Sequence, residues 1–226
     1  MPLAIAFQFK AGRFHATPWG RHVNEGVPEW PPSPWRILRT IVAVAKRKTD
    51  IDNHTLKSLL EKLIDPPEFL LPPATSGHLR CYMPWFKKGP DDKTLVFDSF
   101  VALDKKIDVN ICWQAVNSLR EVEMKSLKQI LDYLGFMGRA ESWCEARILS
   151  DQEIQEVCQK INCKPLNGTP VQPNQELVRV LCADPQTAFK NDRTPKYQEI
   201  SGRGKSKQTT DHPIYDPDWN LCMETL

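Results

Sequence analysis

The sequence predicts an α+β fold whose elements follow the order βαββαβ. Three observations support this prediction. Large apolar residues alternate with small or polar ones over 3–10, which is typical of a strand. Two longer segments, 33–47 and 116–134, repeat apolar residues at helical spacing. Shorter apolar runs at 79–85, 94–103 and 143–149 lie between and after them and supply the other three strands of this order. This is the ferredoxin-like order, here with inserted elements, and a general α+β sandwich is the alternative.

A long loop precedes the first helix, and local sequence signals mark where the loop begins and where the helix starts. Gly12 opens the loop, and Ser33 is a good helix N-cap. Pro34 suits the first helical position because its missing amide hydrogen would have no partner there. A second helix begins at Asp52 or Asn53. The predicted buried stripes are Trp35, Leu38, Ile41, Val42 and Ala45 in the first helix and Leu56, Leu59, Leu60 and Leu63 in the second.

The remaining elements are read from apolar runs and from the residues that flank them. An extended piece at 68–71 is followed by strands at 79–85 and 94–103, which pair as a hairpin, and by a strand at 109–113. The helix at 116–134 has Gly135 as its C-cap. A strand at 143–149, a helix after Ser150 or Asp151 and a strand at 177–182 complete the order. We expect one domain over 1–183 and an irregular, basic, flexible segment over 184–226.

Charge is distributed unevenly along the chain, although the net charge is only +2. Residues 1–50 hold eight Lys and Arg against three Asp and Glu, and residues 186–210 hold six against two. The rest of the chain is therefore acidic. Such an asymmetry gives the molecule a basic face that can attract a polyanion.

The seven cysteines are scattered, with no CxxC and no His at zinc-ligand spacing from a Cys pair. A structural zinc is therefore not expected, and we predict neither a metal nor a cofactor. Free cysteines within apolar runs are typical of a reducing, cytoplasmic protein. No run approaches the length of a membrane span, and no signal peptide is recognised, so no membrane partner is expected.

Cations and aromatic rings are interleaved between residues 12 and 39 as nowhere else in the chain. Cations contact phosphates, and rings or guanidinium planes stack on exposed bases, so this mixture favours RNA. Trp19 is the best stacking candidate, whereas Trp30 and Trp35 are expected to anchor the loop. The RNA-binding residues predicted in this stretch are Arg13, His15, Trp19, Arg21, His22, Arg36 and Arg39.

Three further residues extend the predicted RNA-binding set, namely His78, Arg80 and Arg139. A histidine pair such as His15 and His22 could instead serve a metal-independent endoribonuclease as general acid and base. The WPPSPW segment contains a PxxP that a protein-interaction module could read, but Ser33 and Pro34 are better explained as a helix start. No catalytic residue is assigned.

Five segments of the chain resemble one family of CRISPR-associated proteins. They are GRFHATPWGRHVNEG, EWPPSPWRILRTIVA, LPPATSGHLRCYMP, TLVFDSFV and LGFMGRAESWCEARI. In this order they resemble the type I-G (formerly I-U) proteins that fuse a handle-binding half (the Cas-five family) to a guide-processing half (the Cas-six family). The similarity covers about 3–150 and a short block, YDPDWNLCMETL, at 215–226.

The resemblance implies a fold of the repeat-associated RAMP superfamily, which is ferredoxin-like, and a role in antiviral defence. The chain would be the N-terminal, handle-binding half, with residues 184–226 leading into a second half. It would grip the 5′ handle of the CRISPR RNA within a Cascade complex and cap the backbone subunits. It would also contact the large subunit and, through the complex, target DNA. Processing chemistry is expected mostly in the second half, with cleavage by this chain as the alternative.

Overall fold

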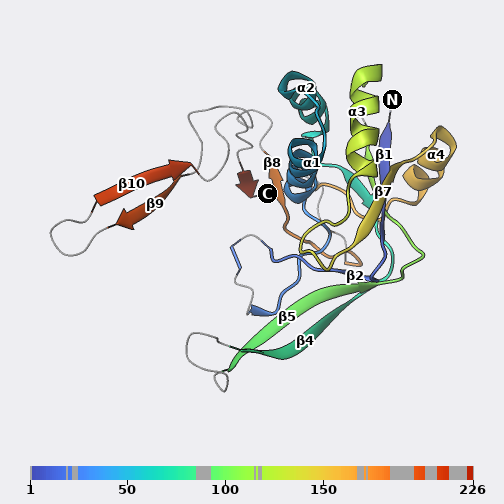
Figure 1. Cartoon of the computed structure of the whole chain (residues 1–226). Coiled ribbons are helices and arrows are strands. Elements are labelled where there is room, and N and C mark those ends of the chain that lie inside the picture. Colours follow the sequence, from blue (N-terminus) through green and yellow to red (C-terminus); the bar gives the residue numbers. More distant parts are fainter. Residues whose placement is uncertain are drawn as a thin grey trace.

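The part of the chain that the structure describes contains four α-helices, a four-stranded sheet, a three-stranded sheet and two pairs of strands. Every strand pair among these residues is antiparallel, and Figure 1 shows the arrangement. The computed structural model describes residues 2–18, 20–21, 25–84, 93–114, 116, 119–166, 171, 173–183, 196–201, 208–213 and 223–225. Over these residues the predicted α+β class is confirmed.

The four-stranded sheet is built around the predicted N-terminal strand. Strand β1 (Leu3–Phe9) lies between β6 (Val109–Trp113) and β7 (Cys144–Ile148), and β3 (Glu68–Leu70) completes the order β3-β6-β1-β7. We expected the strands at 79–85 and 94–103 to be the second and third strands of the βαββαβ order, in one sheet with β1, which is wrong. The sheet contains β3, at its edge, and β6 instead, and the hairpin belongs to the second sheet.

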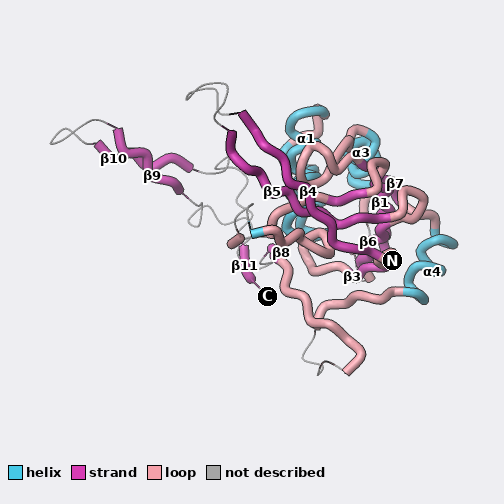
Figure 2. Tube along the Cα trace, turned by 90° about the horizontal axis from the view of Figure 1, so that it is seen from below, coloured by secondary structure: helices cyan, strands magenta, loops and turns pink. Residues whose placement is uncertain are grey.

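Helices cover both faces of the four-stranded sheet. The larger side chains of β1 point to a core shared with α1 (Pro34–Lys48), α2 (Asn53–Leu63) and α3 (Glu121–Asp132). Ala4 and Ala6 point the other way and pack with α4 (Asp151–Lys160) in a smaller cluster. Figure 2 shows α4 on the opposite side of the strands from α1 and α3. The alternation along β1 therefore separates a large core from a small one.

The predicted helix starts are confirmed at α1 and α2. The Ser33 hydroxyl accepts a hydrogen bond from the amide of Arg36, and Pro34 is the first residue of α1. The carboxylate of Asp52 accepts from the amide of Thr55 at 2.9 Å. Every residue of the two predicted apolar stripes is buried. Helix α3 is shorter than predicted at both ends, because it spans Glu121–Asp132 instead of 116–134, and Tyr133 takes the C-cap position instead of Gly135.

A buried carboxylate joins α2 to α3. Glu123 is fully buried and receives hydrogen bonds from Ser58 and Lys62 of α2 and from Arg120 at the start of its own helix. Burial by itself would raise the pKa of Glu123, but these donors outweigh burial and lower the pKa to about 2. The carboxylate therefore stays charged at neutral pH and holds the two helices together.

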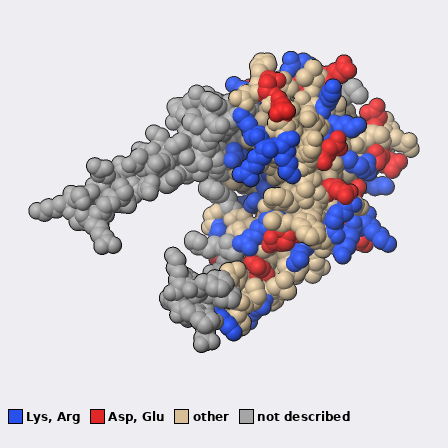
Figure 3. Space-filling model, in the orientation of Figure 1, with Lys and Arg blue, Asp and Glu red and all other residues tan. Residues whose placement is uncertain are grey.

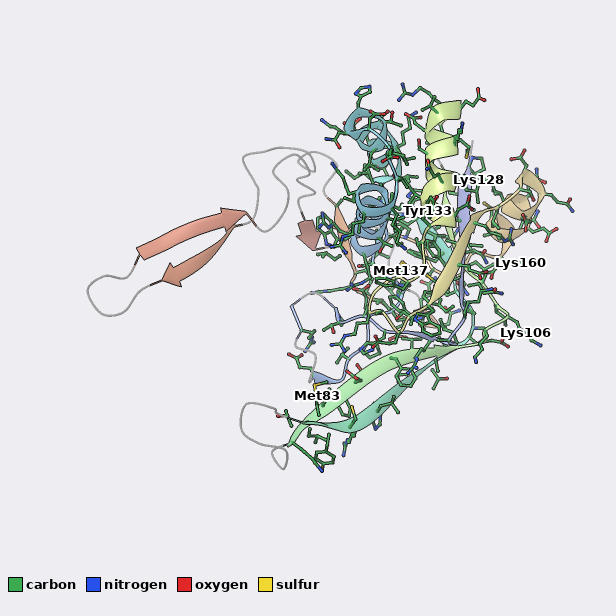
Figure 4. The ribbon with its side chains drawn as sticks, in the orientation of Figure 1. Met83, Lys106, Lys128, Tyr133, Met137 and Lys160 are labelled. Atoms are coloured by element: carbon green, nitrogen blue, oxygen red, sulfur yellow. The ribbon has the colours of Figure 1, made fainter. Side chains whose placement is uncertain are left out.

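The second sheet carries the long hairpin. Strand β4 (Ala74–Pro84) pairs with β5 (Lys93–Leu103) along its whole length, and the short strand β2 (Arg13–Phe14) pairs with the other edge of β5. The predicted hairpin is confirmed, although β4 begins five residues earlier than expected. The hairpin extends from the body of the molecule, with Met83 near its far end (Figures 1 and 4).

Three of the described strands lie within 184–226, where the sequence predicted an irregular segment. Strand β9 (Lys196–Ser201) pairs with β10 (Gln208–Pro213), and β11 (Met223–Thr225) pairs with β8 (Leu181–Ala183), which overlaps the strand predicted at 177–182. The prediction relied on apolar spacing, which the sequences of β9 and β10 (KYQEIS and QTTDHP) do not show. None of the described helices is both long and apolar enough to cross a membrane.

Candidate nucleic-acid interface

One face of the hairpin sheet pairs an arginine with an aromatic ring. Arg13 lies opposite Ala102 across the β2–β5 pair, and Phe100 is the next residue of β5 on the same face. The Arg13 guanidinium carbon is 5.8 Å from the centroid of the Phe100 ring. This is the geometry of a cation–π contact, which leaves the edge of the guanidinium able to donate hydrogen bonds.

On the opposite face of the hairpin, two side chains lie against one aromatic ring. His78 and Arg80 are exposed residues of β4, and Arg80 lies directly opposite Phe97 of β5. The His78 ring stacks on Phe97 with centroids 5.1 Å apart, and the Arg80 guanidinium lies 5.5 Å from the same ring. Planar groups that stack at a surface are suited to contact an unstacked base.

The predicted basic loop is packed against this ring. Gly26 has φ +70°, and a Cβ atom at this position would lie 2.3 Å from Cε1 of Phe97. Only glycine therefore allows the loop to approach Phe97 so closely. The approach brings the loop and the hairpin, which are distant in sequence, to one surface.

Arg36 lies at the start of α1 and is bound within the protein. Its Nε donates to Glu29 Oε1 at 2.7 Å, and Nη2 donates to Glu29 Oε2 at 3.1 Å and to the carbonyl of Thr17 at 2.9 Å. Glu29 is 6% exposed, and its Oε1 also accepts from the amide of Ser33. The pair therefore fixes the loop to α1, and a carboxylate already neutralises this arginine.

A cavity of about 470 Å³ lies between part of the loop and the start of α1. Arg21 lines it and pairs with Glu25 at 3.1 Å, so this cation also has an acidic partner. Arg39 extends the basic surface along α1, with its guanidinium carbon 5.8 Å from the Trp35 ring. Figure 3 shows Lys and Arg side chains gathered where α1 lies. The cavity is lined by Thr17, Pro18, Gly20, Arg21, Glu29, Ser33, Trp35, Arg36 and Leu181.

His15 is a buried residue of the loop. Its side chain is 5% exposed, and Nδ1 is 2.6 Å from Glu141 Oε1. Its amide donates to Ser142 Oγ at 2.7 Å. Burial acts to raise the pKa of Glu141, but a backbone amide and His15 outweigh it, so the pKa is lowered. This burial argues against direct RNA contact by His15 and favours a role in holding the loop.

Arg139 belongs to the turn that holds His15. Its amide donates to the carbonyl of His15 at 2.9 Å, and its Nη1 is 3.1 Å from Asp98 Oδ1 of β5. The preceding Gly138 has φ +89°, and a Cβ atom there would lie 2.5 Å from the His15 carbonyl oxygen. Arg139 thus connects the turn, the loop and the hairpin sheet, while its side chain stays partly exposed.

Two predicted residues, Trp19 and His22, lie outside the described residues. The histidine pair proposed for catalysis is therefore only half described, and its described member is the buried His15. Among the described residues, no group of three or more His, Cys, Asp or Glu could hold a metal ion. In the described structure Arg13, His78 and Arg80 lie at the hairpin sheet. Arg36 and His15 are instead held by the carboxylates of Glu29 and Glu141.

Sequence reasoning missed several residues that form this surface. Phe97 and Phe100 were recognised only as strand residues, although their odd spacing from each other predicts opposite faces of a strand. Away from this surface, Trp143, the residue before β7, is 64% exposed and forms a strand bridge with the exposed Phe136. No local pattern distinguishes an exposed strand aromatic from a buried one, so exposure had to come from the fold.

The face of the four-stranded sheet toward α4 is a poor platform for bases. Along β1 it carries Ala4 and Ala6, which lie beside Cys112 and under Ile154 of α4. Within the four strands no aromatic side chain alternates onto this face. Among the described residues, the four strands of this sheet therefore offer no ring to a base on this face.

Neither the models of known protein families nor the curated proteins contain a match to this chain.

Proposed function

We propose that this chain is an RNA-binding subunit that holds the 5′ handle of a CRISPR RNA within a type I Cascade complex. Its partners would be the guide RNA, the backbone and large subunits, and target DNA through the assembled complex. The observation that carries the proposal is that Arg13 and Arg80 lie over Phe100 and Phe97 on the two faces of one projecting hairpin. The resemblance of five sequence segments supports the choice of ligand.

The chemistry of this hairpin suits a single-stranded RNA. A guanidinium held over a ring keeps donors for phosphate oxygens, and the ring and guanidinium planes can stack on bases. Within the described residues, neither Arg13 nor Arg80 forms a salt bridge with a carboxylate. Among the described carboxylates there is therefore none that RNA would have to displace from these two arginines.

The strand order supports a RAMP-type, ferredoxin-like domain. The elements β1, α1, β3, β6, α3 and β7 follow the order βαββαβ, and they pair as β7-β1-β6-β3. Helix α2 and the β4–β5 hairpin are then insertions in this order. In this view the inserted hairpin supplies the ligand-binding surface, and the ferredoxin-like sheet supports it.

The remaining predicted residues have graded roles in the proposal. Arg39, Arg21 and Arg139 would add positive charge beside the hairpin. Arg36 and His15 would act through the loop they hold. The described geometry does not support cleavage of RNA by this chain. His15, a candidate general acid or base, is buried and hydrogen-bonded to Glu141.

The test is RNA binding by the full chain. Fluorescence anisotropy with a labelled CRISPR-repeat RNA that carries its 5′ handle gives the affinity at several salt concentrations. Each phosphate contact on a single strand contributes a slope of about 0.7 in log Kd against log salt. If each arginine makes one such contact, the double variant Arg13→Ala/Arg80→Ala should lower the slope by about 1.4 and weaken binding about tenfold or more.

Matched variants decide whether the loss is specific. Lys125→Ala and Lys160→Ala remove exposed cations on α3 and α4, outside the hairpin sheet, and should leave the slope of log Kd against log salt unchanged. Thermal unfolding checks that each variant is folded. The proposal fails if the folded double variant binds with the wild-type affinity and slope, or if a scrambled RNA competes as well as the handle RNA.

A further inference from the structure

Two cysteine sulfurs meet between the four-stranded sheet and α4. The Sγ atoms of Cys112 and Cys158 are 3.3 Å apart. Cys112 lies on β6 opposite Ala4, so it points to the face that α4 covers. Cys158 lies on α4 and is half-buried. The two residues are 46 positions apart in the chain, and neither contributes to the RNA surface.

The attachment of α4 to the sheet is otherwise small. The cluster beneath the helix contains Ala4 and Ala6 of the sheet and Ile154 and Val157 of α4. Most other side chains of α4 are exposed. Because the buried apolar area is limited, a covalent link at this point would change how firmly α4 is held.

We propose that Cys112 and Cys158 form a reversible disulfide bond that fastens α4 to the sheet when the thiol pool becomes oxidised. The co-reactant is a low-molecular-weight disulfide such as oxidised glutathione. The sulfurs must approach by little more than 1 Å to reach the bond length of about 2.05 Å, which a small adjustment of side chains can provide.

The reaction proceeds in two thiol–disulfide exchanges. The Cys158 thiolate attacks one sulfur of the small disulfide, forms a mixed disulfide and releases one small thiolate. The Cys112 thiolate then attacks the Cys158 sulfur and releases the second. The two protons from the cysteines end on the two released thiols, and the two electrons reduce the small disulfide.

Burial determines the order of these steps. Cys112 is fully buried, so a small disulfide can reach only Cys158. Burial and the neighbouring Cys158 also raise the pKa of Cys112 to about 12. The second step therefore limits the rate, and formation of the bond between Cys112 and Cys158 should accelerate as the pH rises.

The experiment compares the full chain after incubation with oxidised glutathione and after reduction. Peptide mapping by mass spectrometry without reduction should find a peptide that links Cys112 to Cys158. The bond closes a loop of about 46 residues, which should raise Tm by about 5 to 15 °C. Hydrogen exchange of the α4 amides should slow in the oxidised protein.

Single substitutions provide the controls. Cys158→Ser removes the accessible thiol and should abolish both the linked peptide and the rise in Tm. Cys81→Ser removes an exposed thiol on the hairpin and should preserve both. The proposal is overturned if Cys158 retains a glutathione adduct without closing on Cys112, or if the linked peptide forms without any change in Tm or α4 exchange. RNA affinity does not enter this test, so it is independent of the proposed function.

Discussion

The pair formed by Glu29 and Arg36 predicts a loss of stability when its charge is removed. The perturbation is Glu29→Gln, which keeps the shape of the side chain and removes its charge. Glu29 is 6% exposed and accepts two hydrogen bonds from Arg36 and one from the amide of Ser33. Removing one partner of a fully buried pair costs about 3 to 5 kcal/mol.

The cost here should be smaller than that limit. The Arg36 side chain is 28% exposed, so water can solvate part of its charge after the pair is broken. We therefore expect Glu29→Gln to lower the free energy of unfolding by about 2 to 3 kcal/mol. For a chain of this length the Tm should fall by about 5 to 10 °C.

Urea and thermal unfolding measure the effect, and a double-mutant cycle assigns it. If the two side chains act as one unit, Arg36→Gln should cost a similar amount, and the double variant should cost much less than the sum. Lys57→Gln breaks an exposed pair with Glu61 and should cost less than about 0.5 kcal/mol. A Glu29→Gln variant that melts within 1 °C of the wild type, or additive single effects, would refute the reasoning.

Two further predictions concern the turn and the helix pair. Gly138→Ala should destabilise the protein by about 2 kcal/mol or more, because φ is +89° and the new Cβ would meet the His15 carbonyl oxygen at 2.5 Å. Gly135→Ala, where nothing lies within 4 Å, should be nearly neutral in the same urea titration, and equal losses would contradict this account. Glu123→Gln should be clearly destabilised at pH 7. Because the folded-state pKa of Glu123 is about 2 and its ordinary value is 4.5, the wild type loses this advantage as the pH falls between those values. Unfolding measured from pH 7 to 2.5 should therefore show a shrinking difference, and a constant difference would contradict the prediction.

Local signals in the sequence were sufficient for the starts of α1 and α2. The hydroxyl of Ser33, the ring of Pro34 and the apolar spacing that follows are all read within a few residues, and the structure has the helix there. The same holds for α2, where Asp52 caps the first turn. Capping and periodicity are properties of neighbouring residues, so a single sequence contains them.

The composition of the sheets could not be read in the same way. Strand β3 has three residues, too few for a periodic pattern, yet it holds a place in the main sheet. The hairpin strands looked like core strands because they are rich in apolar residues. In the structure Leu79, Tyr82 and Leu95 are largely exposed. The choice of strand partners depends on contacts between distant residues, which local spacing does not encode.

The candidate site shows a related limit. Counting cations between residues 12 and 39 does not reveal which of these charges are used inside the protein. Arg36 is paired with Glu29 seven residues away, and His15 is bound to Glu141 across 126 residues. A sequence gives the number of charges, whereas their availability depends on the partners that folding brings to them.

The kind of partner that each arginine has, a carboxylate or an aromatic ring, also determines where RNA would bind at the lowest cost in free energy. A carboxylate occupies the donors of a guanidinium, as in Arg36, and a phosphate would have to displace it. An aromatic ring contacts the flat face instead and leaves the donors at the edge. Arg13 and Arg80 have this second kind of partner. The hairpin sheet should therefore contribute most of the salt-dependent affinity.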